Sequence, residues 1–124
     1  MSAPWILVAD DDPDVREMLM LLLNLEGYEV EGASDGVEAL ERIRTRGQPG
    51  LLLLDLRMPR MSGGELAEVL RGDPGWSQIP IVVLSGDLAA THTPSKFGAV
   101  AALAKPVERT TLLRLVHDVV PNGG

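Results

Sequence analysis

Residues 51–55 read Leu-Leu-Leu-Leu-Asp, an unbroken apolar run that ends in an acid. A strand exposed on one face alternates apolar and polar residues, whereas a strand covered on both faces is apolar throughout. The four leucines therefore predict the central strand of a parallel sheet. Asp55 would then lie at the carboxyl edge of that sheet, where the strand leaves the core.

Strand and helix signals alternate five times along the chain. Short apolar runs bounded by turn residues predict strands over residues 5–9, 28–33, 51–55, 79–84 and 100–104. The fourth strand lacks a clear helix after it, because Pro94 has no backbone donor. Residues 86–98 are expected to hold only a short helix, or one that begins at Pro94 with Thr93 as its cap. The alternation predicts an α/β protein whose parallel sheet has helices on both faces.

Helix boundaries are marked by capping residues. Asp12 is the expected N-cap of a first helix that begins at Pro13 and stops at Gly27. Ser34 or Asp35 is the expected cap of the second helix. The apolar positions expected to face the core are Val37, Leu40 and Ile43 on the second helix, and Leu66, Val69 and Leu70 on the third.

Composition excludes several kinds of site. The 124 residues suit one domain over residues 1–124, with 121–124 as a tail or the start of a linker. The absence of cysteine excludes disulfides and thiolate metal sites, and the net charge of −7 disfavours direct nucleic acid binding. No apolar run reaches the roughly 18 residues of a membrane span, and no basic segment precedes a signal core, so we expect a cytoplasmic protein without membrane contact.

Polar residues follow the strands at their carboxyl ends, where ligands collect in parallel sheets. Asp10 and Asp11 follow the first strand, Asp55 ends the third, Ser85 follows the fourth and Lys105 the fifth. Three neighbouring carboxylates would raise one another's pKa values, and a hard divalent cation, Mg²⁺ or Mn²⁺, would relieve their repulsion. Ser85 and Lys105 could then hold a phosphoryl group, and Asp55 could attack it to give an acyl phosphate.

Each residue taken alone has an ordinary structural explanation, such as a helix cap or a surface charge, but their joint placement is specific. The chain resembles the receiver domain of two-component response regulators from Trp5 to about Val120. The motifs that carry this resemblance are Asp10-Asp11, Asp55-Leu56-Arg57-Met58-Pro59, Ser85-Gly86 and Lys105-Pro106. The resemblance implies a flavodoxin-like, doubly wound (βα)5 three-layer sandwich with a five-stranded parallel sheet of order 2-1-3-4-5.

The resemblance also implies roles for the acidic residues. Asp55 would accept a phosphoryl group from a histidine kinase or phosphotransfer protein. Asp11 would bind Mg²⁺ directly, Asp10 mostly through water, and Arg57 only through its backbone carbonyl. The domain would then be a signalling switch that promotes only its own phosphorylation and dephosphorylation, and that controls a downstream partner or output domain.

The remaining motif residues would respond to phosphorylation. Ser85 and Lys105 would hold the phosphoryl oxygens, and the Lys105–Pro106 peptide bond is expected to be cis. Ala102 occupies the position where the family often carries a switch aromatic, and alanine has no ring to rotate. We therefore expect residues 86–98 to be the part of the domain most displaced by phosphorylation.

Three functions of other kinds fit the sequence less well. A Mg²⁺-dependent phosphohydrolase with an aspartyl nucleophile typically needs a second aspartate two positions later, and that position is Arg57. A receiver-like interaction module that is never phosphorylated would be favoured if an acidic or lysine position were missing, and none is. A flavodoxin-like electron carrier is disfavoured because aromatic residues make up only 3% of the chain.

Overall fold

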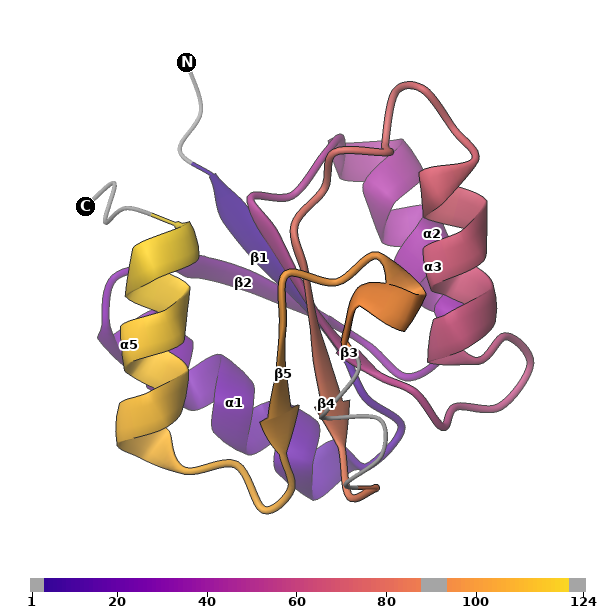
Figure 1. Ribbon diagram of the computed structural model, residues 1–124. Helices are drawn as coiled ribbons and strands as arrows, with labels where there is room; N and C mark the ends of the chain where they lie inside the picture. Colours follow the sequence, from indigo (N-terminus) through magenta and orange to yellow (C-terminus); the bar gives the residue numbers. More distant parts are fainter. Residues whose placement is uncertain (1–3, 88–93, 121–124) are drawn as a thin grey trace.

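The computed structural model describes residues 4–87 and 94–120, and its centre is a five-stranded parallel sheet (Figure 1). The strands are β1 (Trp5–Ala9), β2 (Glu29–Ala33), β3 (Leu51–Asp55), β4 (Ile81–Ser85) and β5 (Ala101–Ala104). Their order is β2-β1-β3-β4-β5, with β3 at the centre. The predicted α/β class, the strand order and the central position of residues 51–55 are confirmed.

Helices cover both faces of the sheet. On one face lie α2 (Gly36–Arg46), α3 (Gly63–Arg71) and the short 3₁₀ helix η1 (Pro94–Phe97), and on the other lie α1 (Pro13–Leu25) and α5 (Arg109–Val119) (Figure 1). The leucines of β3 alternate between the two layers: Leu52 and Leu54 pack on the first, Leu51 and Leu53 on the second. All four are fully buried, which is why the run carries no polar residue. Among the described residues, no helix is long and apolar enough to cross a membrane.

Two positions predicted to face the core do not. Val37 on α2 and Val69 on α3 are each 41% exposed, whereas Ala39 and Ala67 are buried. Successive residues turn by about 100° around a helix, and the buried stripes run one position away from these valines. The residues that form the stripes are Gly36, Ala39, Leu40 and Ile43 on α2, and Gly63, Leu66, Ala67 and Leu70 on α3.

The edges of the elements differ slightly from the sequence expectation. β4 begins at Ile81 rather than residue 79, because Pro80 lacks an N–H and contributes to the sheet only a carbonyl, which accepts the N–H of Leu52 at 2.9 Å. Of the two candidate caps of α2, Asp35 is the N-cap. The predicted start of a short helix at Pro94 is confirmed, and its expected cap, Thr93, lies outside the described residues.

The start of α3 lies directly against the end of β3. Gly63 donates its N–H to the carbonyl of Leu56 at 3.1 Å, and a Cβ atom added at Gly63 would lie 2.2 Å from the carbonyl oxygen of Asp55. Ser62 and Glu65 close a capping box around this first turn. The absence of a side chain at residue 63 therefore sets how closely α3 approaches the acidic edge of the sheet.

This close approach predicts a difference between two adjacent glycines. Gly63→Ala should lower the free energy of unfolding by about 1–3 kcal/mol, because the new methyl group overlaps backbone. Gly64→Ala is the matched control, since its Cβ would meet the Phe97 ring at 3.7 Å and the Ser62 Oγ at 3.9 Å, both ordinary contact distances. That variant should be neutral or stabilise the protein by up to about 1 kcal/mol through helix propensity. Urea unfolding of both variants measures the difference, and equal effects would contradict it.

Candidate functional site

The predicted site residues meet at the carboxyl edge of the sheet. Asp10 follows β1, Asp55 and Ser85 are the last residues of β3 and β4, and Lys105 follows β5. One carboxylate oxygen from each of Asp10, Asp11 and Asp55 lies within 4.8 Å of the others. Parallel strands that end at one level bring these groups together, as their positions in the sequence predict.

Asp10 is the most deeply placed of the three acids, with no solvent exposure. Its Oδ1 accepts the N–H of Asp12 at 2.9 Å. Its Oδ2 is 2.9 Å from the Nζ of Lys105 and, within the described part of the chain, has no donor aligned for a hydrogen bond. The carboxylate is therefore paired by charge but retains an unused acceptor.

Lys105 supplies the positive charge of the site. Its Nζ lies 2.9 Å from Asp10 Oδ2 and 3.4 Å from Asp55 Oδ2. Burial opposes the charge on Lys105, but the two carboxylates outweigh that effect and raise the pKa of its ammonium group. The Lys105–Pro106 bond is cis, as predicted.

Asp55 has an unusually high pKa for a carboxyl group. Its side chain is buried, and this burial together with the negative charge of Asp10 raises its pKa to about 6. The N–H of Arg57, 3.3 Å from Asp55 Oδ1, and the charge of Lys105 oppose the shift without cancelling it. The neighbouring acid therefore raises the pKa of Asp55, as the sequence predicts, but burial raises it more.

An open cleft of about 670 Å³ lies over these groups. Its lining includes Asp11, Asp55, Ser85 and Lys105 together with Arg57, whereas Asp10 lies beneath the floor. Ser85 is buried at the cleft wall, and its Oγ accepts the N–H of Asp87 at 3.0 Å. All the predicted site residues are thus brought together, with Asp10 as the one that solvent does not reach.

The chemistry of the donor set fits a divalent metal ion. Asp10, Asp11 and Asp55 contribute only hard oxygen ligands, which suit Mg²⁺ or Mn²⁺. Within residues 4–87 and 94–120, the only cation paired with this group of three acids is the ammonium of Lys105. Asp10 Oδ2 also keeps an acceptor position that no aligned donor uses. The edge of the sheet therefore carries an acidic pocket that could bind such an ion.

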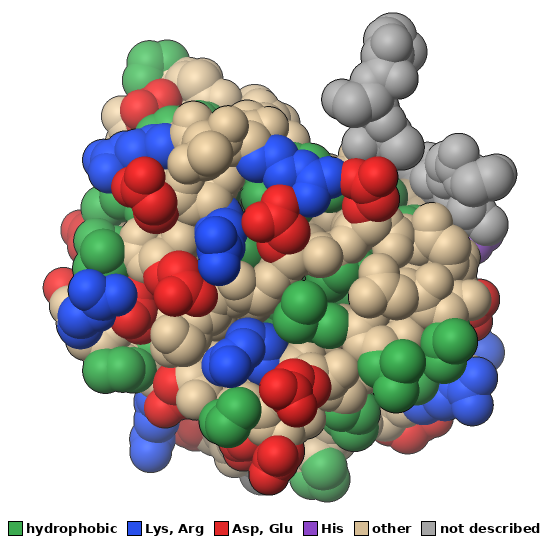
Figure 2. Space-filling model, turned by 180° about the vertical axis from the view of Figure 1, so that it is seen from behind, with side chains coloured by type: hydrophobic (Ala, Val, Ile, Leu, Met, Phe, Trp, Pro, Cys, Tyr) green, Lys and Arg blue, Asp and Glu red, His purple; other side chains and the backbone are tan. Residues whose placement is uncertain are grey.

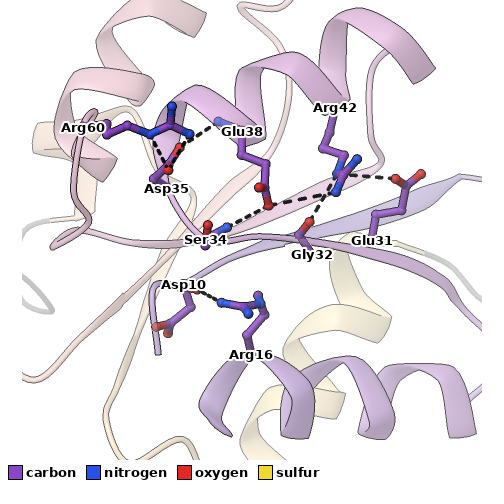
Figure 3. A network of polar contacts seen from close by, with 9 residues as sticks. All are labelled: Asp10, Arg16, Glu31, Gly32, Ser34, Asp35, Glu38, Arg42 and Arg60. Carbon is purple, nitrogen blue, oxygen red and sulfur yellow. Dashed lines mark hydrogen bonds and ion pairs between the residues drawn. The ribbon is translucent and has the colours of Figure 1, made fainter. Parts of the chain in front are cut away.

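Arg16 also supports the site, by a contact to Asp10 that the sequence did not predict. Its Nη1 donates to the backbone carbonyl of Asp10 at 2.8 Å (Figure 3). The side chain reaches this carbonyl by crossing Gly32 of β2, where an added Cβ would lie 3.1 Å from Arg16 Cδ and 2.7 Å from the sulfur of Met20. A glycine inside a strand often marks such a close approach, so Gly32 was the available signal.

Ala102 and Phe97 share one side of the sheet. Both are partly buried and pack against the apolar cluster formed with α2 and α3. Phe97 is in η1, within the 86–98 segment expected to move on phosphorylation, and its ring faces Gly64 at the start of α3. Residues 88–93 of that segment lie outside the described residues, and its displacement stays a prediction.

Comparisons with known proteins agree with this arrangement. A family model described as the response regulator receiver domain matches residues 6–117. Response regulator MprA of Mycobacterium leprae is 49% identical over 119 residues, which cover 93% of this chain and 50% of that protein. The DNA-binding response regulator MtrA of Mycolicibacterium smegmatis is 45% identical over 80 residues, 64% of this chain and 33% of that protein.

The chain is also similar to solved structures of response regulators. The chemotaxis response regulator CheY4 of Vibrio cholerae is 30% identical, with a TM-score of 0.84 over 95% of this chain and 99% of that one. The chain spans a third to a half of the length of the two curated relatives, so their other activities belong to those whole proteins. The fold, the acidic edge of the sheet and the family match agree, and the chain belongs to the receiver domain family of response regulators.

Proposed function

We propose that Asp55 of this receiver domain is the phosphoacceptor, and that it takes a phosphoryl group from the phosphohistidine of a histidine kinase or phosphotransfer protein. The observation that carries the proposal is the place of Asp55, at the end of the central strand, within 4.8 Å of two further acids and 3.4 Å from the ammonium of Lys105. Of the three clustered acids, it is the one that both ends a strand and lines the cleft.

The transfer is a displacement at phosphorus. A carboxylate oxygen of Asp55 attacks, the new P–O bond forms, and the P–N bond to the partner imidazole breaks with its electron pair going to that nitrogen. The Lys105 ammonium and the Ser85 hydroxyl line the same cleft and would hold the phosphoryl oxygens. Asp55 must be ionised to attack, which its pKa of about 6 allows at neutral pH.

The acidic pocket would hold Mg²⁺, with Mn²⁺ as a substitute. Asp11, Asp55 and the backbone carbonyl of Arg57 would be its direct protein ligands, and Asp10 would act mostly through water. The place of Asp11 in the lining of the cleft, to which Asp10 does not contribute, supports a direct role for Asp11. Bound Mg²⁺ would offset the negative charge of the carboxylates and of the incoming phosphoryl group.

The domain would act as a switch rather than as an enzyme with a separate substrate. Arg57 stands where an aspartyl phosphohydrolase typically carries its second acid, which speaks against that alternative. We take residues 1–124 as one domain, with 121–124, which are not described, as a tail or the start of a linker, and we place the domain in the cytoplasm.

We do not expect this domain itself to bind nucleic acid. The net charge is −7, and on the face drawn in Figure 2 basic and acidic side chains lie next to one another rather than in separate fields. The relative MtrA is a DNA-binding protein, but this chain covers only a third of it. DNA binding could therefore belong to a part of such proteins that this chain does not match.

Phosphorylation should be confined to Asp55. Incubation with Mg²⁺ and a small-molecule phosphodonor should give a base-labile adduct, and Asp55→Asn should abolish it because the amide is not a nucleophile. Asp12→Asn is the matched control: Asp12 lines the same cleft, and asparagine keeps its N-cap. Mass spectrometry locates the label, and full labelling of the Asp55→Asn protein would refute the assignment.

The two flanking acids should differ in their effect on the metal. Asp11→Ala should weaken Mg²⁺ binding more than Asp10→Ala, because we expect only Asp11 to bind the ion directly. Isothermal titration calorimetry on the unphosphorylated variants measures both affinities. Equal losses would mean that the two carboxylates share the ion in the same way.

The raised pKa of Asp55 also predicts a change in stability. Its carboxyl pKa rises from 3.8 to about 6 in the folded protein, so the stability that this group contributes is full below pH 4 and is lost as the pH rises through 6. Asp55→Asn removes the buried charge. Without Mg²⁺, it should raise the free energy of unfolding at pH 7 by about 1–3 kcal/mol and change little at pH 4.

Urea denaturation of wild type and variant at both pH values measures this effect. Asp118→Asn, which removes an exposed carboxylate from α5, controls for the change in net charge. If the Asp55→Asn protein is less stable than wild type at pH 7, its surroundings stabilise the ionised carboxylate of Asp55. That result would contradict a pKa raised by burial and by the charge of Asp10.

A further inference from the structure

The loop between β3 and α3, residues 56–62, carries the Arg57 carbonyl and is fixed to the rest of the domain at two places. At its end, Gly63 brings α3 against the carbonyl of Asp55. Near its middle, the loop lies against the start of α2, an element that contributes no residue to the cleft. The contacts at this second place involve Arg60 and Asp35 (Figure 3).

A buried carboxylate lies at the centre of the second contact. Asp35 is 5% exposed; its Oδ1 accepts the N–H of Glu38 at 2.8 Å and so caps α2. Its Oδ2 is 2.8 Å from both Nε and Nη2 of Arg60. Burial works against the charge of Asp35, but these hydrogen bonds and the Arg60 charge outweigh it and lower the pKa of the carboxyl group.

Backbone contacts reinforce the same attachment. The carbonyl of Met61 accepts the N–H of Gly36 at 2.9 Å, and a Cβ atom at Gly36 would lie 2.5 Å from that oxygen. Arg60 adopts φ of 64°, in the left-handed region that a residue with a side chain rarely occupies. The loop is therefore held in a conformation that its own backbone does not favour, and the residue with the unfavourable φ, Arg60, is the one whose side chain pairs with Asp35.

We propose that Asp35 and Arg60 form a positioning pair for the metal site: their ion pair fixes the β3–α3 loop so that the Arg57 carbonyl and the Asp55 carboxylate are held ready for Mg²⁺. The inference rests on the proposed function, in which those two groups are metal ligands. Arg57 precedes Arg60 by three residues, and its N–H donates to Asp55 Oδ1 at 3.3 Å, so a shift of the loop reaches the phosphoacceptor.

The geometry of the pair sets it apart from ordinary surface ion pairs. Exposed pairs contribute little, because solvent screens them and two long side chains must be ordered. Here the Arg60 side chain is 61% exposed, but its partner Asp35 is buried, and two nitrogens of the guanidinium contact the same oxygen, Asp35 Oδ2, which fixes direction as well as distance. Partners that orient metal ligands typically change metal affinity by about 10- to 100-fold.

The test is calorimetric titration of Mg²⁺ into the unphosphorylated full chain. Arg60→Gln should weaken binding by about tenfold, the lower end of that range because Arg60 contacts no ligand directly. Asp35→Asn should weaken it similarly, since asparagine keeps the cap of α2 but loses the charge. The double variant should bind no more weakly than either single variant, because the two changes remove one interaction.

Matched variants separate this role from a general loss of structure. Arg42→Gln removes an arginine of α2 whose side chain contacts Gly32, Glu31 and Glu38, all outside the loop, and it should leave Mg²⁺ affinity within twofold of wild type, a margin of about 0.4 kcal/mol. Arg60→Lys should bind with intermediate affinity, because lysine restores the charge but not the paired contact. If Arg60→Gln unfolds, Arg60→Gly suits the positive φ and should show the same loss of affinity.

The outcomes also distinguish the pair from the proposed function. Failure of the wild type to bind Mg²⁺, or to become labelled at Asp55, would refute the function itself. If the wild type binds and is labelled but folded Arg60→Gln binds Mg²⁺ with wild-type affinity, the function stands and the positioning role is refuted. An equal loss in Arg42→Gln would also refute it, since the effect would then not depend on the loop.

Discussion

One ammonium group, that of Lys105, lies between the carboxylates of Asp10 and Asp55, with Asp11 close beside them. With every acid ionised, three negative charges face this one positive charge, which leaves a local excess of two. Burial makes that excess costly, and the raised pKa of Asp55 is its direct expression. The fit of the site to a divalent cation follows from this imbalance.

The apolar sheet makes the imbalance tolerable. Burying one leucine side chain contributes about 1.5–3 kcal/mol, so the four leucines of β3 together contribute about 6–12 kcal/mol. Raising the pKa of Asp55 by about two units costs about 3 kcal/mol. The buried leucines that precede Asp55 therefore help to offset the cost of ending the strand in a destabilised carboxylate.

Much of this arrangement was predictable from the sequence, because a strand end is a local feature. The run of leucines before Asp55 indicated a buried strand, and parallel pairing then placed Asp10, Ser85 and Lys105 at the same edge. Burial of individual helix positions was less predictable. Val37 and Val69 looked like core residues, but the buried stripes of these helices include glycine and alanine beside leucine and isoleucine, and leave the two valines exposed.

The contacts of Arg16 and Arg60 could not be predicted from the sequence, for a different reason. Arg16 and Arg60 each reach a group that belongs to another element, and no local pattern encodes which arginine does so. Their signals were indirect: Gly32 inside a strand, where Arg16 passes, and Gly36 beside Asp35, where the loop approaches. Such close approaches become visible only when the elements are packed together.

Asp55 is a buried carboxylate that the charge of Asp10 destabilises further, and a bound divalent cation would relieve both effects. The state of this group can be followed by titration of the Asp55 side-chain carboxyl with ¹³C NMR, with and without saturating Mg²⁺. We expect a midpoint near pH 6 without metal, since burial and Asp10 raise the pKa to about 6, and a clear shift to lower pH when Mg²⁺ is bound. A midpoint near the ordinary carboxyl value of about 4 that Mg²⁺ does not change would contradict it.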